Sequence, residues 1–194
     1  KPVPIAVVPF GWQQSQSLPE DVGAIISADL YRSGLFALMP RNSMLSFPTQ
    51  PSEVYYRDWR MANQEYLLVG KVESEPGNRY KIQYELFDVI KEQRILAEHI
   101  SGSASQLRRM SHRIADAIYE KLTGIPGAFA TQIVYVSAKR LSQEDYRYQL
   151  ELADADGANP RTILQSRQPI LSPSWSHDGN NLAYVSFETG RPAV

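Results

Sequence analysis

The sequence predicts an α/β domain, with a mixed sheet covered by two or three helices, followed by the first blade and part of the second of an all-β propeller. Three observations support this class. Helix-like and strand-like segments alternate up to about residue 128, helical periodicity then stops after Gly127, and short strand-like runs separated by turns follow it. We therefore place the domains at residues 1–128 and 129–194.

The composition is that of a packed globular protein. Of 194 residues, 43% are hydrophobic and 21% charged, which supports a core and argues against bulk disorder. The 20 Lys and Arg against 21 Asp and Glu lack the basic excess of a nucleic-acid-binding protein. The absence of cysteine excludes disulfides, thiolate metal sites and cysteine nucleophiles. No apolar run approaches the roughly 18 to 20 residues of a membrane helix. A cytosolic protein and one whose leader has been removed both fit.

The first domain begins with a strand and a helix. Ile5–Phe10 is a short apolar run that reads as a buried strand. Ser17–Glu20 has the form of a capping box, so we expect the helix to start there and to end near Gly34. Phe36–Met39 is the second predicted strand.

A second helix, three strands and a long helix complete the predicted domain. Ser52 is expected to cap a helix whose apolar face includes Tyr55, Trp59 and Ala62. The strands are expected at Tyr66–Val69, Tyr80–Val89 and Arg94–Ser101, and the long helix at about Gln106–Leu122, stopped by Gly124 and Pro126.

An internal repeat marks the second domain. Strands are predicted at Ile133–Ser137, Tyr148–Ala153, Arg161–Leu164 and Leu182–Ser186. The first and last share an apolar–Tyr–Val–Ser pattern and start 49 positions apart, at Ile133 and Leu182, which is the spacing of a propeller blade. Two partial copies also fit an unrelated pair of hairpins.

A motif in the second repeat resembles the TolB family of propellers. Ser172–Gly179 reads Ser-Pro-Ser-Trp-Ser-His-Asp-Gly, and Leu-Ala-Tyr follows at Leu182. The family pattern is S-P-x-W-S-P-D-G-x-x-L-A-Y, so His177 stands where proline is usual. The resemblance implies that Asp178-Gly179 makes the tight turn after the innermost strand of a blade and that Trp175 fills the space between blades.

The first half is similar to the amino-terminal domain of the same family. The matching segments lie in order and at compatible spacing: Ile5–Phe10, Ile26–Gly34, Leu68–Val72, Leu107-Arg108, His112, Ile118–Gly124 and Gly127–Phe129.

The resemblance implies a non-enzymatic periplasmic component of the Tol-Pal envelope system, without a cofactor. In that family the propeller binds the lipoprotein Pal, and a segment ahead of the α/β domain binds TolA. The system maintains outer-membrane integrity and aids outer-membrane invagination at cell division, and some bacteriocins use the same propeller surface for import. The TolA-binding segment is expected ahead of Lys1, and roughly 200 further residues are expected to complete a six-bladed ring.

The candidate partner-binding residues precede the inner strand of the second blade. They are Gln168, Pro169, Ile170 and Leu171. Loops before inner strands gather at one mouth of a propeller, where Ile170 and Leu171 are expected to present apolar anchors. Packing of Leu171 between blades is the alternative.

Other motifs are interpreted as structural. His112 and Asp116 lie one helical turn apart, as in a solvated surface pair, and Arg108, Arg109 and Arg113 form a solvated helix face. Adjacent Ser176-His177-Asp178 lacks the geometry of a catalytic triad. Asp154–Gly157 fits a type I′ turn better than a calcium loop, because the twelfth position is Gln165.

Two other functions stay open. Prolyl-oligopeptidase-type serine peptidases also carry propellers with similar turns, so the chain fits a fragment of one whose catalytic domain lies elsewhere. A serine elbow downstream would indicate that enzyme. Small mixed sheets with helices also occur in RNA-binding modules, which the neutral charge disfavours.

Overall fold

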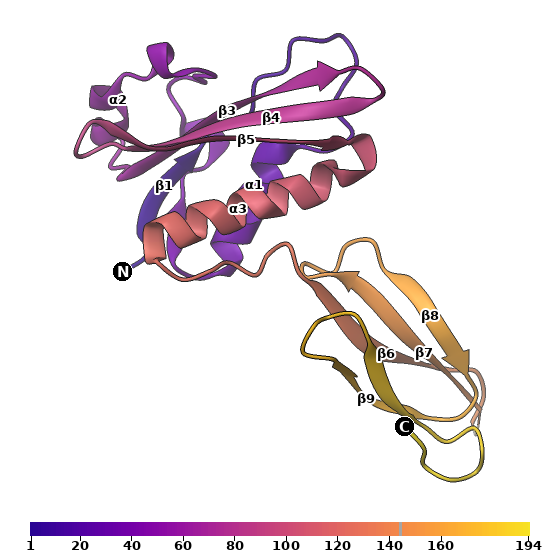
Figure 1. The fold of residues 1–194 in the computed structure, drawn as a ribbon. Coiled ribbons are helices and arrows are strands. Elements are labelled where there is room, and N and C mark those ends of the chain that lie inside the picture. Colours follow the sequence, from indigo (N-terminus) through magenta and orange to yellow (C-terminus); the bar gives the residue numbers. More distant parts are fainter. Residues whose placement is uncertain (144) are drawn as a thin grey trace. The chain divides into compact units, whose positions relative to one another are not determined.

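The computed structural model describes residues 1–143 and 145–194, and they form two compact units, Lys1–Ala130 and Thr131–Val194. The predicted fold class is confirmed: the first unit is a mixed sheet with helices, and the second consists of propeller-type strands (Figure 1). The strands of the second unit form sheets of their own and do not extend the first sheet.

The first unit is built on a five-stranded sheet. Its strands are β1 (Val3–Val7), β2 (Phe36–Leu38), β3 (Tyr66–Glu75), β4 (Arg79–Asp88) and β5 (Gln93–Ser103), in the order β2-β1-β3-β4-β5. β1 runs parallel to β2 and β3, whereas β3, β4 and β5 pair antiparallel as hairpins. The parallel pairs need crossovers, and the chain makes them with helices.

The first helix, α1 (Val22–Arg32), starts later than predicted. Its N-cap is Asp21, whose side chain accepts a hydrogen bond from the amide of Ala24. The expected capping box at Ser17–Glu20 is therefore wrong as the helix start. Asp21 is an equally good cap, and its position immediately before Val22 lets the apolar face of α1 meet the sheet.

The second predicted helix divides into two short pieces. Pro51–Glu53 forms a single 3₁₀ turn, and α2 (Tyr56–Met61) follows without a side-chain cap at Ser52. Of the predicted apolar face, Trp59 is buried, but Tyr55 is 67% exposed. Trp59 packs with the side chains on the sheet face opposite α1: Ala6, Val8, Leu67, Val69, Phe87 and Val89.

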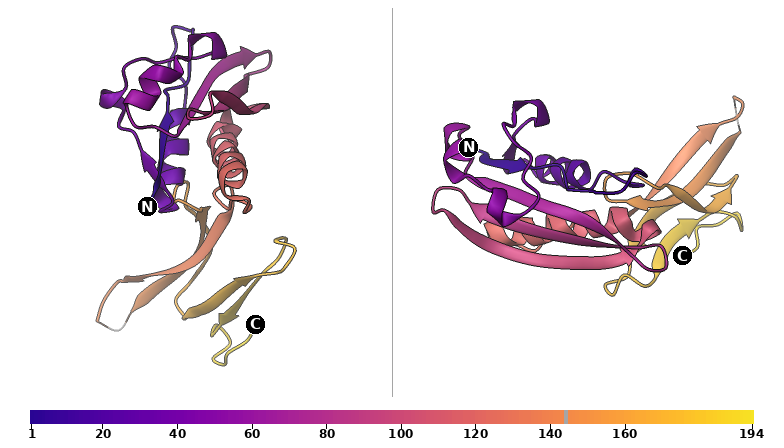
Figure 2. Two further views of the ribbon diagram at one scale, coloured as in Figure 1. Left: turned by 90° about the vertical axis from the view of Figure 1, so that its left-hand side faces the viewer. Right: turned by 90° about the horizontal axis from the view of Figure 1, so that it is seen from above.

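The long helix α3 (Leu107–Thr123) and α1 cover the other face of the sheet. They lie side by side in both sets of views (Figures 1 and 2). Gly124 ends α3 with a φ of 75°, which glycine adopts without strain. The largest fully buried side chains of this layer are Ile5, Ile26, Leu30, Leu68, Ile82, Leu86, Leu107, Ile114 and Ile118.

The second unit has two antiparallel sheets. One contains β6 (Gln132–Arg140), β7 (Tyr146–Asp154) and β8 (Arg161–Ser166), and the other pairs β9 (Ile170–Trp175) with β10 (Leu182–Ser186). The turn after β7 is not the predicted type I′ turn: positive φ values fall on Gly157 and Asn159, and a longer loop results. The buried apolar side chains are Leu150, Leu152, Ala153 and Ile170.

Candidate functional site

The four predicted partner-binding residues lie at the connection from β8 to β9. The amide of Gln168 donates to the hydroxyl of the buried Ser166, which holds the connection close to β8. Gln168 is exposed and Pro169 half-buried. The two predicted anchors differ, because Ile170 is 1% exposed and belongs to the core, whereas Leu171 is 48% exposed. Leu171 is thus the apolar side chain that this segment presents to solvent.

A β-bulge lies directly after Leu171. The pairing of β9 with β10 shifts register between Leu171 and Ser174, and Ser172 has a φ of 50°. Positive φ is uncommon for a residue with a side chain, and such bulges are frequent beside functional sites. The sequence analysis did not predict this bulge. Its signal in the sequence was Pro173, because proline within a sheet occurs mainly at edges and bulges.

The Asp178-Gly179 turn has the predicted form. Gly179 has a φ of 71°, and its amide donates to the carbonyl of Ser176. The Asp178 carboxylate accepts from the Ser176 hydroxyl at 2.5 Å and from the amide of Asn180 at 3.1 Å. These bonds, the Ser176 hydroxyl first, lower the pKa of Asp178 below its usual value. The hydroxyl of Ser176 is thus bonded to the aspartate as part of the turn.

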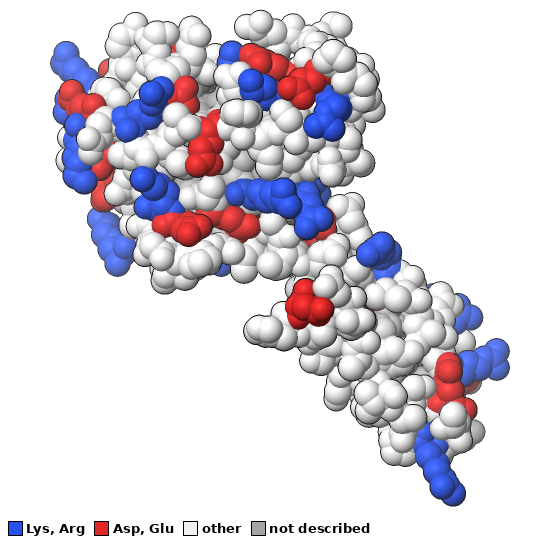
Figure 3. All heavy atoms as spheres, in the orientation of Figure 1, with Lys and Arg blue, Asp and Glu red and all other residues white. Residues whose placement is uncertain are grey.

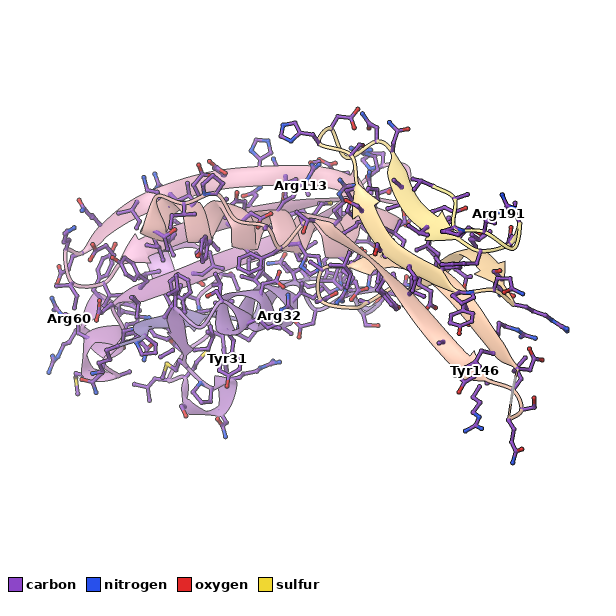
Figure 4. The ribbon with its side chains drawn as sticks, turned by 90° about the horizontal axis from the view of Figure 1, so that it is seen from below. Tyr31, Arg32, Arg60, Arg113, Tyr146 and Arg191 are labelled. Atoms are coloured by element: carbon purple, nitrogen blue, oxygen red, sulfur yellow. The ribbon has the colours of Figure 1, made fainter. Side chains whose placement is uncertain are left out.

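His112 is buried, and its predicted surface pairing with Asp116 is wrong. Its side chain is 2% exposed, and 2.5 Å separates its Nδ1 from Oδ2 of Asp29 on α1. The two side chains thus share a hydrogen bond inside the protein. The other oxygen of Asp29 accepts from Arg32, which projects from the same helix (Figure 4). Asp29 and His112 therefore link α1 to α3 inside the core.

Asp116 instead holds the end of the first unit. Its two carboxylate oxygens accept from the amides of Phe129 and Ala130, at 2.7 and 3.1 Å. Gly127 packs so closely that a Cβ there would meet Asp116 Oδ1 at 2.3 Å. The ring of Phe129 packs edge-on against Tyr119, with centroids 5.6 Å apart. Residues 127–130 are thus fastened to α3.

On the face of the molecule shown in Figure 3, no large patch carries charges of a single sign. Lys and Arg alternate there with Asp and Glu (Figure 3). Arg108, predicted to be solvated, is only 21% exposed and forms an ion pair with Glu20, whereas Arg109 and Arg113 are exposed as expected. Every helix among the described residues is too short or too polar to cross a bilayer.

Both units match family models. Residues 1–95 match the TolB amino-terminal domain, and residues 119–194 match the TolB beta propeller domain. The chain is 52% identical over 191 residues to the Tol-Pal system protein TolB of Pseudomonas syringae pv. syringae and 52% identical over 192 residues to that of Pseudomonas aeruginosa. These matches cover 98% and 99% of the chain and 44% of each relative.

A solved structure matches as well. The crystal structure of TolB from Acinetobacter baumannii superimposes with a TM-score of 0.84 at 37% sequence identity, covering 100% of this chain and 46% of that one. The chain thus spans less than half the length of the relatives it matches. The two family models, the identity along almost the whole chain and the shared fold lead to one conclusion: this chain belongs to the TolB family.

Proposed function

We propose that this chain is part of a non-enzymatic, protein-binding component of the Tol-Pal system that acts in the periplasm. The observation that carries the proposal is the 52% identity, over 98% of the chain, to a protein named as part of that system. The proposed role is to maintain outer-membrane integrity and to aid outer-membrane invagination at division. Bacteriocins that exploit the propeller for import are proposed to use the same propeller surface.

Binding of the lipoprotein Pal is proposed at the connection before β9. Gln168 is exposed there, and Leu171 presents a large apolar side chain beside the bulge. A partner that covered the exposed side chain of Leu171 would remove its apolar surface from water, which favours association. Pro169 stiffens the connection, and the buried Ile170 anchors it in the core.

Binding of TolA is proposed for residues that precede Lys1 in the complete protein. This part of the proposal rests on the family alone. Deleting those residues from the complete protein is expected to abolish capture of purified TolA while leaving capture of Pal unchanged. If TolA is still captured after the deletion, the TolA-binding site lies elsewhere in the protein.

The chemistry of the turn supports a binding role over the serine peptidase alternative. A nucleophilic serine needs a base aligned with its hydroxyl. Ser176 instead donates to Asp178, two residues away, within a tight turn. An assay of the complete protein against fluorogenic peptides is expected to give no turnover above the buffer rate.

The test of the Pal site uses the complete protein and purified Pal. Leu171→Asp places a charge where the partner would bury an apolar side chain, so we expect Kd for Pal to rise by about tenfold or more. Ile163→Asp is the matched control, because Ile163 is 50% exposed on β8 and lies outside the proposed site. Ile170→Asp is unsuitable, since a buried charge would unfold the unit.

Two outcomes would contradict this proposal. If a folded Leu171→Asp variant binds Pal with unchanged affinity, Leu171 is not part of the site. If the unmodified complete protein does not bind Pal, the proposed function itself is wrong. Circular dichroism and thermal unfolding of both variants establish that any loss of affinity does not come from misfolding.

A further inference from the structure

The α/β unit carries a continuous polar groove that the proposed function does not use. Two hollows, of about 390 and 210 Å³, share Thr49 and Lys71. Together they form what we call the glutamine groove, since four glutamines line it: Gln13, Gln14, Gln50 and Gln83. Both hollows are partly open, and the larger has the size of a small-molecule site.

The walls of the groove come from three parts of the chain. After β1 the chain continues beside β3, where Gly11 forms a parallel bridge with Lys71 (Figure 1). The amide of Gly11 donates to the carbonyl of Gly70, and its carbonyl accepts from Val72. A Cβ at Gly11 would meet Thr49 at 2.7 Å, so glycine lets these segments approach. The groove is therefore a built feature of the fold.

Side chains of the groove are held by hydrogen bonds. Gln14 donates to the Ser74 hydroxyl at 2.5 Å, and Gln83 donates to Glu73 at 3.1 Å. A primary amide carries two N–H donors and an oxygen with two lone pairs. One such bond orients each amide and leaves it capacity for a ligand, so the groove offers pre-oriented donors and acceptors.

Charges in the groove are already balanced. The Lys71 ammonium lies 2.7 Å from the carboxylate of Glu73, and Arg94 lies 2.6 Å from that of Glu85. Hydrogen bonding from Lys71 lowers the pKa of Glu73, which keeps the pair ionised. A charged ligand would have to separate one of these pairs, whereas an uncharged polar ligand would not.

An aromatic ring borders the polar groups. The indole N–H of Trp12 donates to the carbonyl of Gln16 at 2.6 Å. The ring also packs against Tyr80, with centroids 5.8 Å apart. Its polar atom is thus satisfied, and its surface serves the groove as an apolar wall.

We propose that the glutamine groove binds an uncharged glycan chain. Sugar rings present hydroxyl or acetamido groups to oriented amides and carboxylates, and an apolar C–H face to an aromatic ring. The groove combines these features with cancelled charges, and its two hollows provide length for more than one sugar. An extended peptide fits less well, because the Gln14–Ser74 bond ties the loop to β3 where a peptide strand would pair.

The test is a titration of the isotope-labelled 194-residue chain, followed by nuclear magnetic resonance. Cellotetraose supplies hydroxyl groups alone, and tetra-N-acetylchitotetraose adds acetamido groups. We expect at least one of them to give saturable shifts of the side-chain amides of Gln14, Gln50 and Gln83 and of the Trp12 indole. A response to one sugar only supports the proposal and identifies the group that is recognised.

The variant Gln14→Ala/Gln83→Ala is expected to weaken that binding by about tenfold, because two oriented amides are lost. Gln93→Ala is the matched control, since Gln93 is exposed at the start of β5 and does not line the groove. Absence of saturable shifts with both sugars would overturn the proposal. So would unchanged sugar affinity in the double variant, or saturation of the groove by an alanine-based hexapeptide but by neither sugar.

Discussion

Replacement of Asp29 by alanine is the sharpest test of how the α/β unit is held together. The change deletes the carboxylate that joins α1 to α3 through His112. Asp29 and His112 are 1% and 2% exposed, so water does not replace the lost partner. Breaking a buried pair by removing one member costs about 3–5 kcal/mol. That is a large share of the total of about 5–15 kcal/mol that stabilises a domain.

The control is Arg32→Ala, which removes the second partner of Asp29. Arg32 is 42% exposed, and ion pairs of that kind contribute about 0–1 kcal/mol. The structure therefore predicts a difference of at least about 2 kcal/mol between the two variants. For a domain of this size, the loss in Asp29→Ala corresponds to a fall in Tm of roughly 10–20 °C.

The assay is urea unfolding followed by tryptophan fluorescence. Trp12, Trp59 and Trp175 are the three tryptophans, so a Trp175→Phe background confines the signal to the α/β unit. Free energies of unfolding are compared by linear extrapolation. A loss below about 1 kcal/mol in Asp29→Ala, or equal losses in both variants, would refute the reasoning that burial makes this pair important.

Three further predictions follow from close packing and from pKa shifts. Gly127→Ala places a Cβ 2.3 Å from Asp116 Oδ1, so it is expected to lower the free energy of unfolding by about 1–3 kcal/mol, and an unchanged urea midpoint would contradict this contact. The pKa of Asp178 is lowered from its ordinary value of 3.8, so the ionised carboxylate stabilises the turn above that pH. This stabilisation is lost as pH falls through the folded-state pKa, and Asp178→Ala is expected to abolish that acid dependence in thermal unfolding. Burial, and then the hydrogen bond to Glu98, raise the pKa of Tyr84 above its ordinary value of 10.0. The contribution of this tyrosine to folding stability is therefore present below pH 10.0 and is lost as pH rises through the folded-state pKa. In an ultraviolet titration, the tyrosine that ionises at the highest pH is expected to be missing in Tyr84→Phe.

Periodicity and turn chemistry predicted the strands and helices of the α/β unit, whereas the resemblance to the family motif was needed to identify the propeller. Tyr80, Ile82, Tyr84 and Leu86 alternate along β4, and all four belong to or pack against the core shared with α1 and α3, as the two-residue period of a strand requires. Helix starts were harder, because Ser17 and Asp21 are both good caps. The choice of Asp21 depends on where the apolar face of α1 meets the sheet, which no local pattern contains.

Within the candidate binding segment, the sequence predicted apolar anchors at both Ile170 and Leu171 but did not show that the first is buried and the second exposed. The strand period alone places neighbouring side chains on opposite faces, and which face is buried depends on β10 and on the bulge at Ser172. The glutamine groove had no sequence signal, because its walls come from residues as far apart as Gly11 and Glu85, which meet only in the folded chain.

What the sequence determined by itself was local: most of the strands and helices, where helical periodicity ends, and which turn carries Asp178-Gly179. The tertiary structure decided what depends on distant partners. His112 and Asp116 lie four positions apart on α3, yet His112 bonds to Asp29 and Asp116 to the backbone of residues 129–130. Burial, not spacing, decides the partner of a polar side chain, because a hydrogen bond lost inside the protein is not replaced by water.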